Sequence, residues 1–446
     1  MKIFWRIAFR NLFRNGRRNL LTGSSIALGL VGICLLGGYI LRMERYLATQ
    51  SVYLNLNGHI VVYAEGGLDR HLADPQKYTL SPIQVAAVTS FRDERIERIA
   101  PLLRAGGLVH NGCLSFPYSA LAALPADIAW ARQTPNVNQY VRELALVNRG
   151  RGFWESAADS INVSPRLAQI LGKEKVAGEE GAQALESIGD CSRDKQKMAQ
   201  DPSLQLLGSA FPGGIALADA TLAGLVSSGM AFQDDTALLM PFPMAQMMYG
   251  TDRVTSLALF LHNENDIPAV MGALNAHLEK TGVKADLYPF YDENISAFYV
   301  GGMQFNWVML YLFLLLVCSV VGISISNSLY ISLLERKAEF GTLRSLGFNQ
   351  RAVGTLLLME SFFLLIFSFL PALIVTALLT TLMNSLSIRL TIPGLAGDIQ
   401  FRLHVTPTFV LLVMALLSIL VLLVTRVGGE KFLRRQILDL LGTSSC

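Results

Sequence analysis

The chain has few charged residues for its length. Of its 446 residues, 16% are Asp, Glu, Lys or Arg, whereas 52% are hydrophobic. Soluble domains usually contain about 25% charged residues, so this composition indicates a protein that lies largely in lipid. Residues 294–334 contain no charged side chain, and residues 352–388 contain one, Glu360. Each run is longer than the roughly 20 residues that a helix needs to cross a bilayer.

The sequence also lacks the common motifs of catalysis and nucleotide binding. It contains no Gly-x-x-x-x-Gly-Lys-Ser/Thr phosphate loop, no His-Glu-x-x-His, no Cys-x-x-Cys and no Gly-x-Ser-x-Gly. The six histidines are scattered without the spacing of metal ligands. We therefore expect no catalytic residue, no metal site and no cofactor bound by this chain. A membrane protein without a site of its own must be driven by, or support, another protein.

Four apolar segments predict transmembrane helices, at about residues 20–41, 304–328, 354–382 and 405–424. The first segment is longer than the roughly 7–15 apolar residues of a cleaved signal peptide, so we expect it to be retained. About 260 more polar residues separate the first span from the other three. The predicted fold class is an α-helical membrane protein with four transmembrane helices (1+3) plus a large α/β extracytoplasmic domain between helices 1 and 2.

The distribution of Lys and Arg predicts the orientation in the membrane. The segments before the first span, between the second and third spans and after the fourth span are all basic. Residues 42–302 instead contain 21 basic and 28 acidic residues, a net charge of −7. We therefore expect a multi-pass protein of the cell inner (plasma) membrane with cytoplasmic N- and C-termini and a periplasmic insert. The basic segments are typical of a membrane surface, and no nucleic-acid partner is expected.

These patterns predict the following domain boundaries along the chain. They are a cytoplasmic interfacial amphipathic helix (1–19), transmembrane helix 1 with an outward stalk (20–57), a periplasmic α/β domain of two subdomains (58–293), a stalk with transmembrane helix 2 (294–334), a cytoplasmic coupling helix (335–351), transmembrane helix 3 (352–388), an outer loop (389–404), transmembrane helix 4 (405–425) and a cytoplasmic tail (426–446). Within the insert we expect strands at 58–63, 106–110 and 256–261, helices at 81–98, 164–172 and 266–281, and a mobile loop at 173–203.

Of the five cysteines, Cys113 and Cys191 are the two that lie in the predicted extracytoplasmic domain. A disulfide between them would persist in an oxidising compartment. The sequence leaves open whether the two cysteines are bridged or remain unpaired.

A short charged segment, residues 335–348, lies between two apolar runs. A helix that is tied at both ends to membrane spans transmits force, because its movement must shift at least one of them. Glu360 lies early in the third span, where an ionisable group is costly and therefore a functional candidate. Alternatively, Glu360 is a structural partner of Arg336, Lys337 or Arg344.

Three pieces of the sequence resemble the FtsX-like permease family, the membrane subunits of type VII ABC transporters such as macrolide exporters and lipoprotein-release systems. The segment Glu335-Arg336-x-x-Glu339-Phe340-Gly341-x-Leu343-Arg344-Ser345-Leu346-Gly347 is similar to the coupling segment of the family. Glu360 is similar to an acid early in the family's third span, and residues 8–18 resemble its N-terminal interface helix. The 1+3 layout agrees with the family over the whole length of the chain.

The resemblance implies a set of partners and a site. The partners are a cytoplasmic ABC ATPase dimer that binds ATP and Mg, a second permease (an identical copy or a related sister chain), a periplasmic adaptor or carrier protein, and membrane lipid. The coupling of the ATPase to this chain would rest on Glu335, Arg336, Glu339, Gly341, Arg344, Gly347 and Phe348. In this reading, the charged residues and Phe348 contact the ATPase, and the two glycines permit tight turns or close approach.

The function that the resemblance implies is transport by mechanotransmission. Closure of the ATPase dimer would move the outer domain and thereby extract or export an amphipathic substrate, which is a lipoprotein, toxin, antibiotic or peptide. The alternative is a non-transporting signalling scaffold that activates a cell-wall hydrolase through its outer domain. In neither case is the chain itself an enzyme.

Overall fold

The computed structural model describes residues 9–11, 14, 16–185, 191, 194–345, 347–391 and 394–433. The chain divides into two compact units, which are described separately. The helical unit comprises Met1–Met43, Gly302–Arg389 and Gln400–Cys446, and the α/β unit comprises Glu44–Gly301 and Leu390–Ile399.

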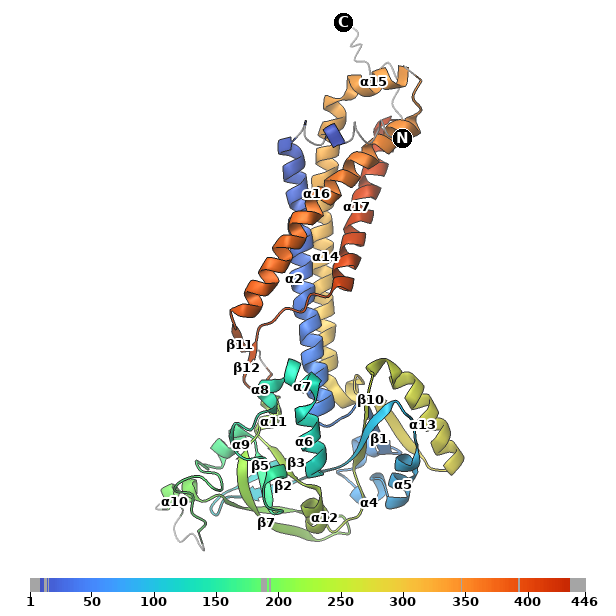
Figure 1. Cartoon of the computed structure of the whole chain (residues 1–446). Coiled ribbons are helices and arrows are strands. Elements are labelled where there is room, and N and C mark those ends of the chain that lie inside the picture. The colour runs from blue at the N-terminus through green and yellow to red at the C-terminus, as the bar shows by residue number, and fades with distance from the viewer. Residues whose placement is uncertain are drawn as a thin grey trace. The chain divides into compact units, whose positions relative to one another are not determined.

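Four long apolar helices confirm the predicted 1+3 pattern (Figure 1). They are α2 (Gly16–Thr49), α14 (Glu293–Glu335), α16 (Gln350–Ser385) and α17 (Pro407–Leu433). Each is long and apolar enough to cross a membrane. A short helix, α15 (Lys337–Ser345), connects α14 to α16.

The four long helices share one apolar core. Its buried residues come from α2 (Ile26, Leu30, Val31, Ile33, Cys34), α14 (Val317, Val321, Ile325), α16 (Leu365, Phe369, Ala372) and α17 (Val413, Leu417, Val421). Small residues of α2 permit this close packing. A Cβ atom on Gly37 would lie 2.2 Å from the ring of Phe409, and one on Gly29 would lie 2.7 Å from Val317. The small residues of the first span are therefore required for the close packing of these helices.

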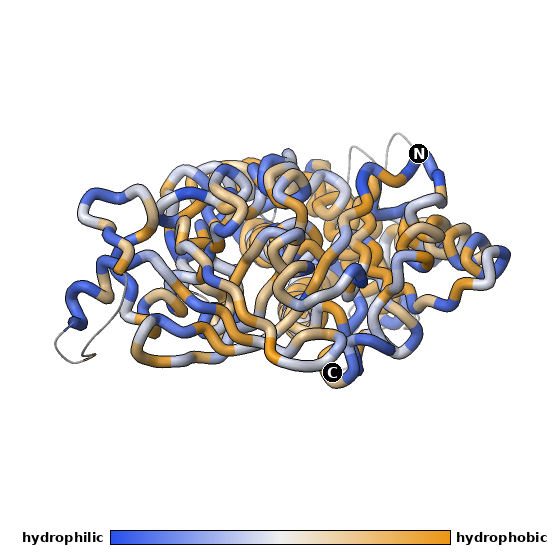
Figure 2. Tube along the Cα trace, turned by 90° about the horizontal axis from the view of Figure 1, so that it is seen from below, coloured by the Kyte–Doolittle hydropathy of each residue, from blue (hydrophilic) through white to orange (hydrophobic). Residues whose placement is uncertain are grey.

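The α/β unit is built on one ten-stranded sheet. Its strands are β1 (Ile60–Ala64), β2 (Ile96–His110), β3 (Ser115–Ala123), β4 (Arg149–Gly150), β5 (Ser160–Val163), β6 (Ser203–Ser209), β7 (Ile215–Leu225), β8 (Ala237–Pro241), β9 (Ser256–Leu261) and β10 (Ala285–Pro289). The hydrophilic residues gather on peripheral loops, as the blue segments of Figure 2 show. A further pair, β11 (Arg389–Thr391) and β12 (Asp398–Gln400), forms a separate two-stranded sheet.

The long strand β2 belongs to two groups of strands. Its first half pairs with β9, which continues the sheet to β1 and β10. Its second half pairs with β6, and its other edge pairs with β3. Hydrogen bonds then run from β3 through β8, β5 and β7 back to β6, so these strands close into a ring. Closure removes the unpaired edges that an open sheet would expose.

Short helices connect the strands of the α/β unit. They are α3 (Gly67–Arg70), α4 (Pro75–Tyr78), α5 (Pro82–Ser90), α6 (Pro125–Gln133), α7 (Pro135–Tyr140), α8 (Arg142–Ala145), α9 (Pro165–Ile170), α10 (Lys195–Gln200), α11 (Ala231–Asp234), α12 (Phe242–Tyr249) and α13 (Ile267–Thr281), with single turns at Gln50–Leu54, Phe153–Glu155 and Glu264–Asp266. Ser81 caps α5 with a reciprocal capping box, and Ser164 caps α9.

Two local predictions were wrong. The helix expected to continue through residues 92–98 ends at Ser90, and β2 begins at Ile96. The reason is tertiary, because residues from Ile96 onward pair with the buried strand β9. The loop expected at 173–203 contains α10, in which Met198 and Ala199 are buried. Residues 186–190, 192 and 193 of that segment lie outside the described part of the chain.

Cys113 and Cys191 form a disulfide, with their Cα atoms 5.7 Å apart. Cys113 lies in the turn between β2 and β3, and 78 positions separate the two cysteines. The bridge therefore ties the segment before α10 to the β2–β3 hairpin.

Candidate functional site

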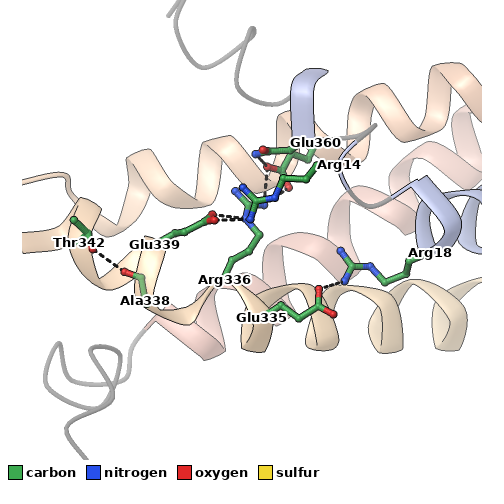
Figure 3. A network of polar contacts seen from close by, with 9 residues as sticks. Arg14, Arg18, Glu335, Arg336, Ala338, Glu339, Thr342 and Glu360 are labelled. Carbon is green, nitrogen blue, oxygen red and sulfur yellow. Dashed lines mark hydrogen bonds and ion pairs between the residues drawn. The ribbon is translucent and has the colours of Figure 1, made fainter.

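An ion-pair network, here called the junction network, surrounds Arg336 at the connection between α14 and α15 (Figure 3). Arg336 Nη1 lies 2.9 Å from both carboxylate oxygens of Glu360, and its Nε lies 2.9 Å from Glu339 Oε2. Only 5% of the Arg336 side chain is exposed. Because Glu360 belongs to α16, one buried guanidinium joins three consecutive helices of the chain.

The N-terminal segment contributes three further contacts to the junction network. Asn11 donates a hydrogen bond of 2.6 Å to Glu360. Arg14 donates one of 2.5 Å to Glu339, and Arg18 donates one of 2.6 Å to Glu335. Each of the three acids therefore has a partner from the N-terminal segment. These three partner residues and the junction of α14, α15 and α16 are held together by charge and hydrogen bonding.

The charges of the junction network balance, with Arg14, Arg18 and Arg336 opposite Glu335, Glu339 and Glu360. Partial burial alone would raise the pKa of Glu339, but the hydrogen bonds from Arg14 and Arg336 lower that pKa below its usual value. Removing one partner of a buried pair leaves an uncompensated charge, which typically costs about 3–5 kcal/mol. The network therefore favours one arrangement of the helices over alternatives that separate the partners.

Phe340 anchors α15 against the long helices. Its side chain is fully buried among Leu333 of α14, Val353 and Leu357 of α16, and Phe432 of α17. The guanidinium of Arg336 lies 4.9 Å from the centre of its ring. A cation directly before α15 is thus combined with an aromatic ring on its inward face, one helical turn later.

The opposite face of α15 is exposed. Ala338, Thr342 and Ser345 follow one another along it at helical spacing. Thr342 donates its hydroxyl hydrogen to the Ala338 carbonyl, 2.9 Å away (Figure 3). This hydrogen bond uses the donor hydrogen of the Thr342 side chain. Phe348, just beyond the helix, is 42% exposed. This set (Ala338, Thr342, Ser345 and Phe348) is called the α15 outer face below.

Gly347 ends the helix in a conformation that glycine adopts readily. Its φ of +91° lies in the left-handed region. The Phe348 amide donates to the Leu343 carbonyl at 3.1 Å, which is the longer hydrogen bond of a Schellman motif. Gly341 is buried within α15. The helix therefore has a fixed end at Ser345, five positions before α16 begins at Gln350.

The junction network brings together four of the residues that the sequence singled out: Glu335, Arg336, Glu339 and Glu360. Gly341, Gly347 and Phe348 lie on the same helix or directly after it. The backbone of Arg344 lies in α15, whereas its side chain, Leu346 and residues 1–8 are outside the described part. Of the open alternatives for Glu360, the structure favours pairing with Arg336.

Phe340 and Asn11 belong to the site but were not among the residues predicted for it. Phe340 had a signal, because it follows Arg336 by four residues and precedes Leu343 by three, which places all three on one helical face. Asn11 had none, since its partner Glu360 lies 349 residues away. Among the described residues, no group of three or more His, Cys, Asp or Glu side chains is arranged to hold a metal ion.

Comparison with known families identifies the C-terminal part of the chain. Residues 311–435 match the family described as FtsX-like permease C-terminal. This stretch contains most of α14 together with α15, α16 and α17, and so includes Arg336, Phe340 and Glu360.

A curated relative is the lipoprotein-releasing system transmembrane protein LolC of Neisseria meningitidis serogroup B (strain ATCC BAA-335 / MC58). The two sequences are 23% identical over 159 residues. The match covers 35% of this chain and 37% of the relative, so the chain spans little more than a third of the length of that protein.

Two solved structures have some similarity to the chain. The periplasmic region of MacB from Actinobacillus actinomycetemcomitans has 12% identity and a TM-score of 0.32, covering 52% of this chain and 87% of that one. The extracellular domain of the noncanonic ABC-type transporter YknZ from Gram-positive bacteria has 11% identity and a TM-score of 0.30, covering 52% and 97%. At these TM-scores neither similarity identifies a function.

Proposed function

We propose that this chain, a member of the FtsX-like permease family, is the permease subunit of an ATP-driven ABC transporter. In this role it pairs with a second permease and with a cytoplasmic ABC ATPase dimer that supplies the ATP hydrolysis. The family match over residues 311–435 supports the permease assignment, and the four apolar helices support its place in the inner membrane. By the distribution of positive charge, α15 and both termini face the cytoplasm.

The main support for this proposal is that α15 is fixed to the long helices on one face and exposed on the other. Arg336 and Phe340 tie its inner face to α14, α16 and α17, while the α15 outer face is exposed. A force applied to the outer face therefore reaches the long helices through contacts that resist separation. This is the arrangement that mechanotransmission requires.

The same geometry divides the roles of the predicted coupling residues. Arg336 is almost fully buried, so in this proposal it is a positioning residue that fixes the orientation of α15. The contact with the ATPase is made by the α15 outer face and by the half-exposed Glu339. Gly347 sets where the helix ends and where Phe348 begins.

The substrate in this proposal is amphipathic and is handled on the periplasmic side. The similarity to a lipoprotein-releasing protein supports extraction of a lipoprotein as the first substrate to examine. The large α/β unit between the first and second spans is the part that would act on it. A scaffold that activates a cell-wall hydrolase would use the same ATPase contact but would release no substrate from the membrane.

The proposal is tested by native purification with two matched threonine variants. Thr342 lies on the α15 outer face, and Thr281 is an exposed threonine of the α/β unit. The hydroxyl of each donates to the carbonyl four residues earlier. We expect an ABC ATPase to copurify with the wild type and with Thr281→Arg when ATP hydrolysis is blocked. We expect Thr342→Arg to reduce its recovery at least tenfold, because a bulky charge is placed in the contact.

Either of two results would contradict the proposal. If mass spectrometry finds no ABC ATPase in the wild-type preparation, the permease assignment to an ATP-driven complex is wrong. If the ATPase is recovered equally with Thr342→Arg and Thr281→Arg, the α15 outer face is not the contact. Release of radiolabelled lipoproteins from spheroplasts, compared with and without the protein, then separates transport from the scaffold.

A further inference from the structure

The α/β unit contains a cavity of about 490 Å³ that the transport proposal does not use. Its wall is formed by the residues after α2 (Leu54, Asn55, Asn57), by the strands β2, β3 and β8, by α6 and by residues 226–236. This volume lies in the range of roughly 300–1,000 Å³ that is typical of small-molecule sites. The cavity is therefore large enough for an organic ligand.

Two arginines, Arg104 and Arg132, are the charged residues that line this cavity. Arg104 Nη2 donates to the Asn55 carbonyl at 3.2 Å and to Asn57 Oδ1 at 2.9 Å. Arg132 Nη1 donates to the Ala145 carbonyl at 2.8 Å. All of these acceptors are neutral, and among the described residues neither guanidinium forms an ion pair with a carboxylate.

Of the two arginines, Arg132 is the one whose charge is more costly to bury. Its exposed fraction is 9%, and burial lowers its pKa to about 10. Its guanidinium lies 5.0 Å from the ring centre of Trp154, which compensates only part of the lost hydration. A buried charge without a partner is unfavourable. An anion in the cavity would supply the missing opposite charge.

The nearby carboxylate of Asp234 does not fill this role. Its Oδ1 accepts hydrogen bonds from the Ser228 amide and hydroxyl, and its Oδ2 accepts one from the Ser227 hydroxyl. Asp234 is thus bound by the loop that it stabilises. Ser227 and Ser228 line the cavity, whereas Asp234 does not.

The rest of the lining is mixed, and its apolar side chains form a substantial part of the wall. It includes Leu54, Leu68, Leu121, Val226, Phe232 and Leu239. A small inorganic anion would leave these side chains against water, whereas a ligand with an apolar part would cover them. The cavity therefore combines the two surfaces that an amphiphile needs.

We propose that this cavity binds an anionic amphiphile, whose carboxylate or phosphate contacts Arg104 and Arg132 and whose apolar body packs against the leucine and phenylalanine side chains. The ligand class is an acyl-chain carboxylate or an alkyl phosphate, such as part of a lipid. This site is independent of the ATPase contact, so it exists whether or not the chain works as a transporter.

The test uses the full chain in lipid nanodiscs and the fluorescence of its tryptophans. Trp154 lies beside Arg132, so occupancy at that guanidinium changes its emission. Octyl phosphate and octanoate are the anionic probes, octanol is the neutral probe, and empty nanodiscs correct for partition into lipid. We expect a saturable change with at least one anion and none with octanol. A preference for one anion identifies the headgroup as phosphate or carboxylate.

Variants of single arginines locate the site. Arg104→Gln and Arg132→Gln keep a hydrogen-bond donor but remove the positive charge, and we expect each to raise the Kd of the anion at least tenfold. Arg142→Gln is the matched control, because Arg142 is exposed on α8 and does not line the cavity. We expect its Kd to equal that of the wild type.

Two results would overturn the proposal. One is an unchanged Kd in Arg104→Gln, and the other is a response to octanol equal to that of the anions. If Arg132→Gln does not fold, Ala237→Phe replaces it, because Ala237 lines the cavity and a phenyl ring there would occupy its volume. Folded Ala237→Phe that still binds the anion with wild-type affinity would likewise refute the site.

Discussion

One nitrogen of Arg336 lies 2.9 Å from each carboxylate oxygen of Glu360, and this pair joins the α14–α15 connection to α16. Without a partner, Glu360 would be an acid in an apolar span, which is costly in free energy. In the pair, Glu360 gives the buried guanidinium of Arg336 a partner of opposite charge. The pairing also fixes which turn of α16 lies against the start of α15.

Replacing Glu360 by Gln removes the charge while keeping the size of the side chain. Among the described residues, Arg336 then retains only the half-exposed Glu339 as an anionic partner, and we expect the free energy of unfolding to fall by about 3 kcal/mol. Denaturant unfolding in detergent micelles measures this change. Glu430→Gln is the matched control, since its pair with Arg426 is exposed and should change stability by about 0.5 kcal/mol or less. Equal effects of the two variants would contradict the structural role of Glu360.

Charge reversal at Glu339 should act on coupling more than on folding. Glu339→Lys places a third cation beside Arg14 and Arg336, so the inner and outer contacts of α15 both change. We expect membrane insertion to remain normal and ATP hydrolysis to become uncoupled from movement of the α/β unit. Hydrolysis rate and the distance between spin labels in the α/β unit, measured in one reconstituted complex, report the two properties. Nucleotide-dependent distances that match the wild type would show that Glu339 has no part in coupling.

The contact of Gly37 with Phe409 predicts a strict limit on side-chain size in α2. Gly37→Ala would place a methyl group 2.2 Å from the Phe409 ring. Either the ring must then move, or α2 must separate from α17. We expect a loss of about 1–3 kcal/mol, read as a lower Tm in detergent. Gly322→Ala in α14 is the control, because a Cβ there meets nothing within 4 Å. A Tm for Gly37→Ala at or above that of Gly322→Ala would argue against this packing.

The disulfide between Cys113 and Cys191 predicts redox-dependent stability. The two cysteines are 78 positions apart, and a closed loop of this length restricts the unfolded chain by up to about 4 kcal/mol. We expect Cys113→Ser to have a lower Tm than the oxidised wild type. Reductant should lower the wild-type Tm to that of the variant and leave the variant unchanged. If reductant lowers the Tm of both proteins equally, the stabilisation does not come from this bridge.

His59 predicts a pH dependence of the α/β unit. Burial lowers its pKa to about 4, an effect that nearby Glu264 only partly opposes, and its Nδ1 accepts a hydrogen bond of 2.9 Å from the Leu261 amide. An unfolded histidine titrates near pH 6.5. Between these values the unfolded state binds the extra proton, so the contribution of His59 is complete above about pH 6.5 and is lost as the pH falls towards 4.

The expected size of this loss is on the order of 3 kcal/mol over the whole window. Chemical unfolding of the wild type and of His59→Gln at pH 7 and pH 5 isolates it from other titrating groups. Gln retains an acceptor for the Leu261 amide but does not titrate. We therefore expect the wild type to lose more stability than His59→Gln between the two pH values. Parallel losses would show that His59 is not the buried group responsible.

Some elements of this protein were predictable because their signals are local. The long apolar runs identified all four long helices, since about 20 apolar residues suffice to specify a span. Ser164 followed by Pro165 predicted α9, and the apolar run 256–261 predicted β9. Each of these signals lies within the element that it specifies. The same local logic failed at residues 92–98, where pairing with β9 overrides the helical preference of the charged side chains.

The sequence by itself determined the number and order of the membrane helices, the charged segment between two of them and the presence of an acid in the third span. Only the tertiary structure decided that Glu360 pairs with Arg336, that Asn11 reaches it from 349 residues away, and that Phe340 is buried beneath α15. The physical reason is range. Hydropathy and capping act between near neighbours in the chain, whereas ion pairs and aromatic packing depend on which helices lie side by side, and that depends on the whole core.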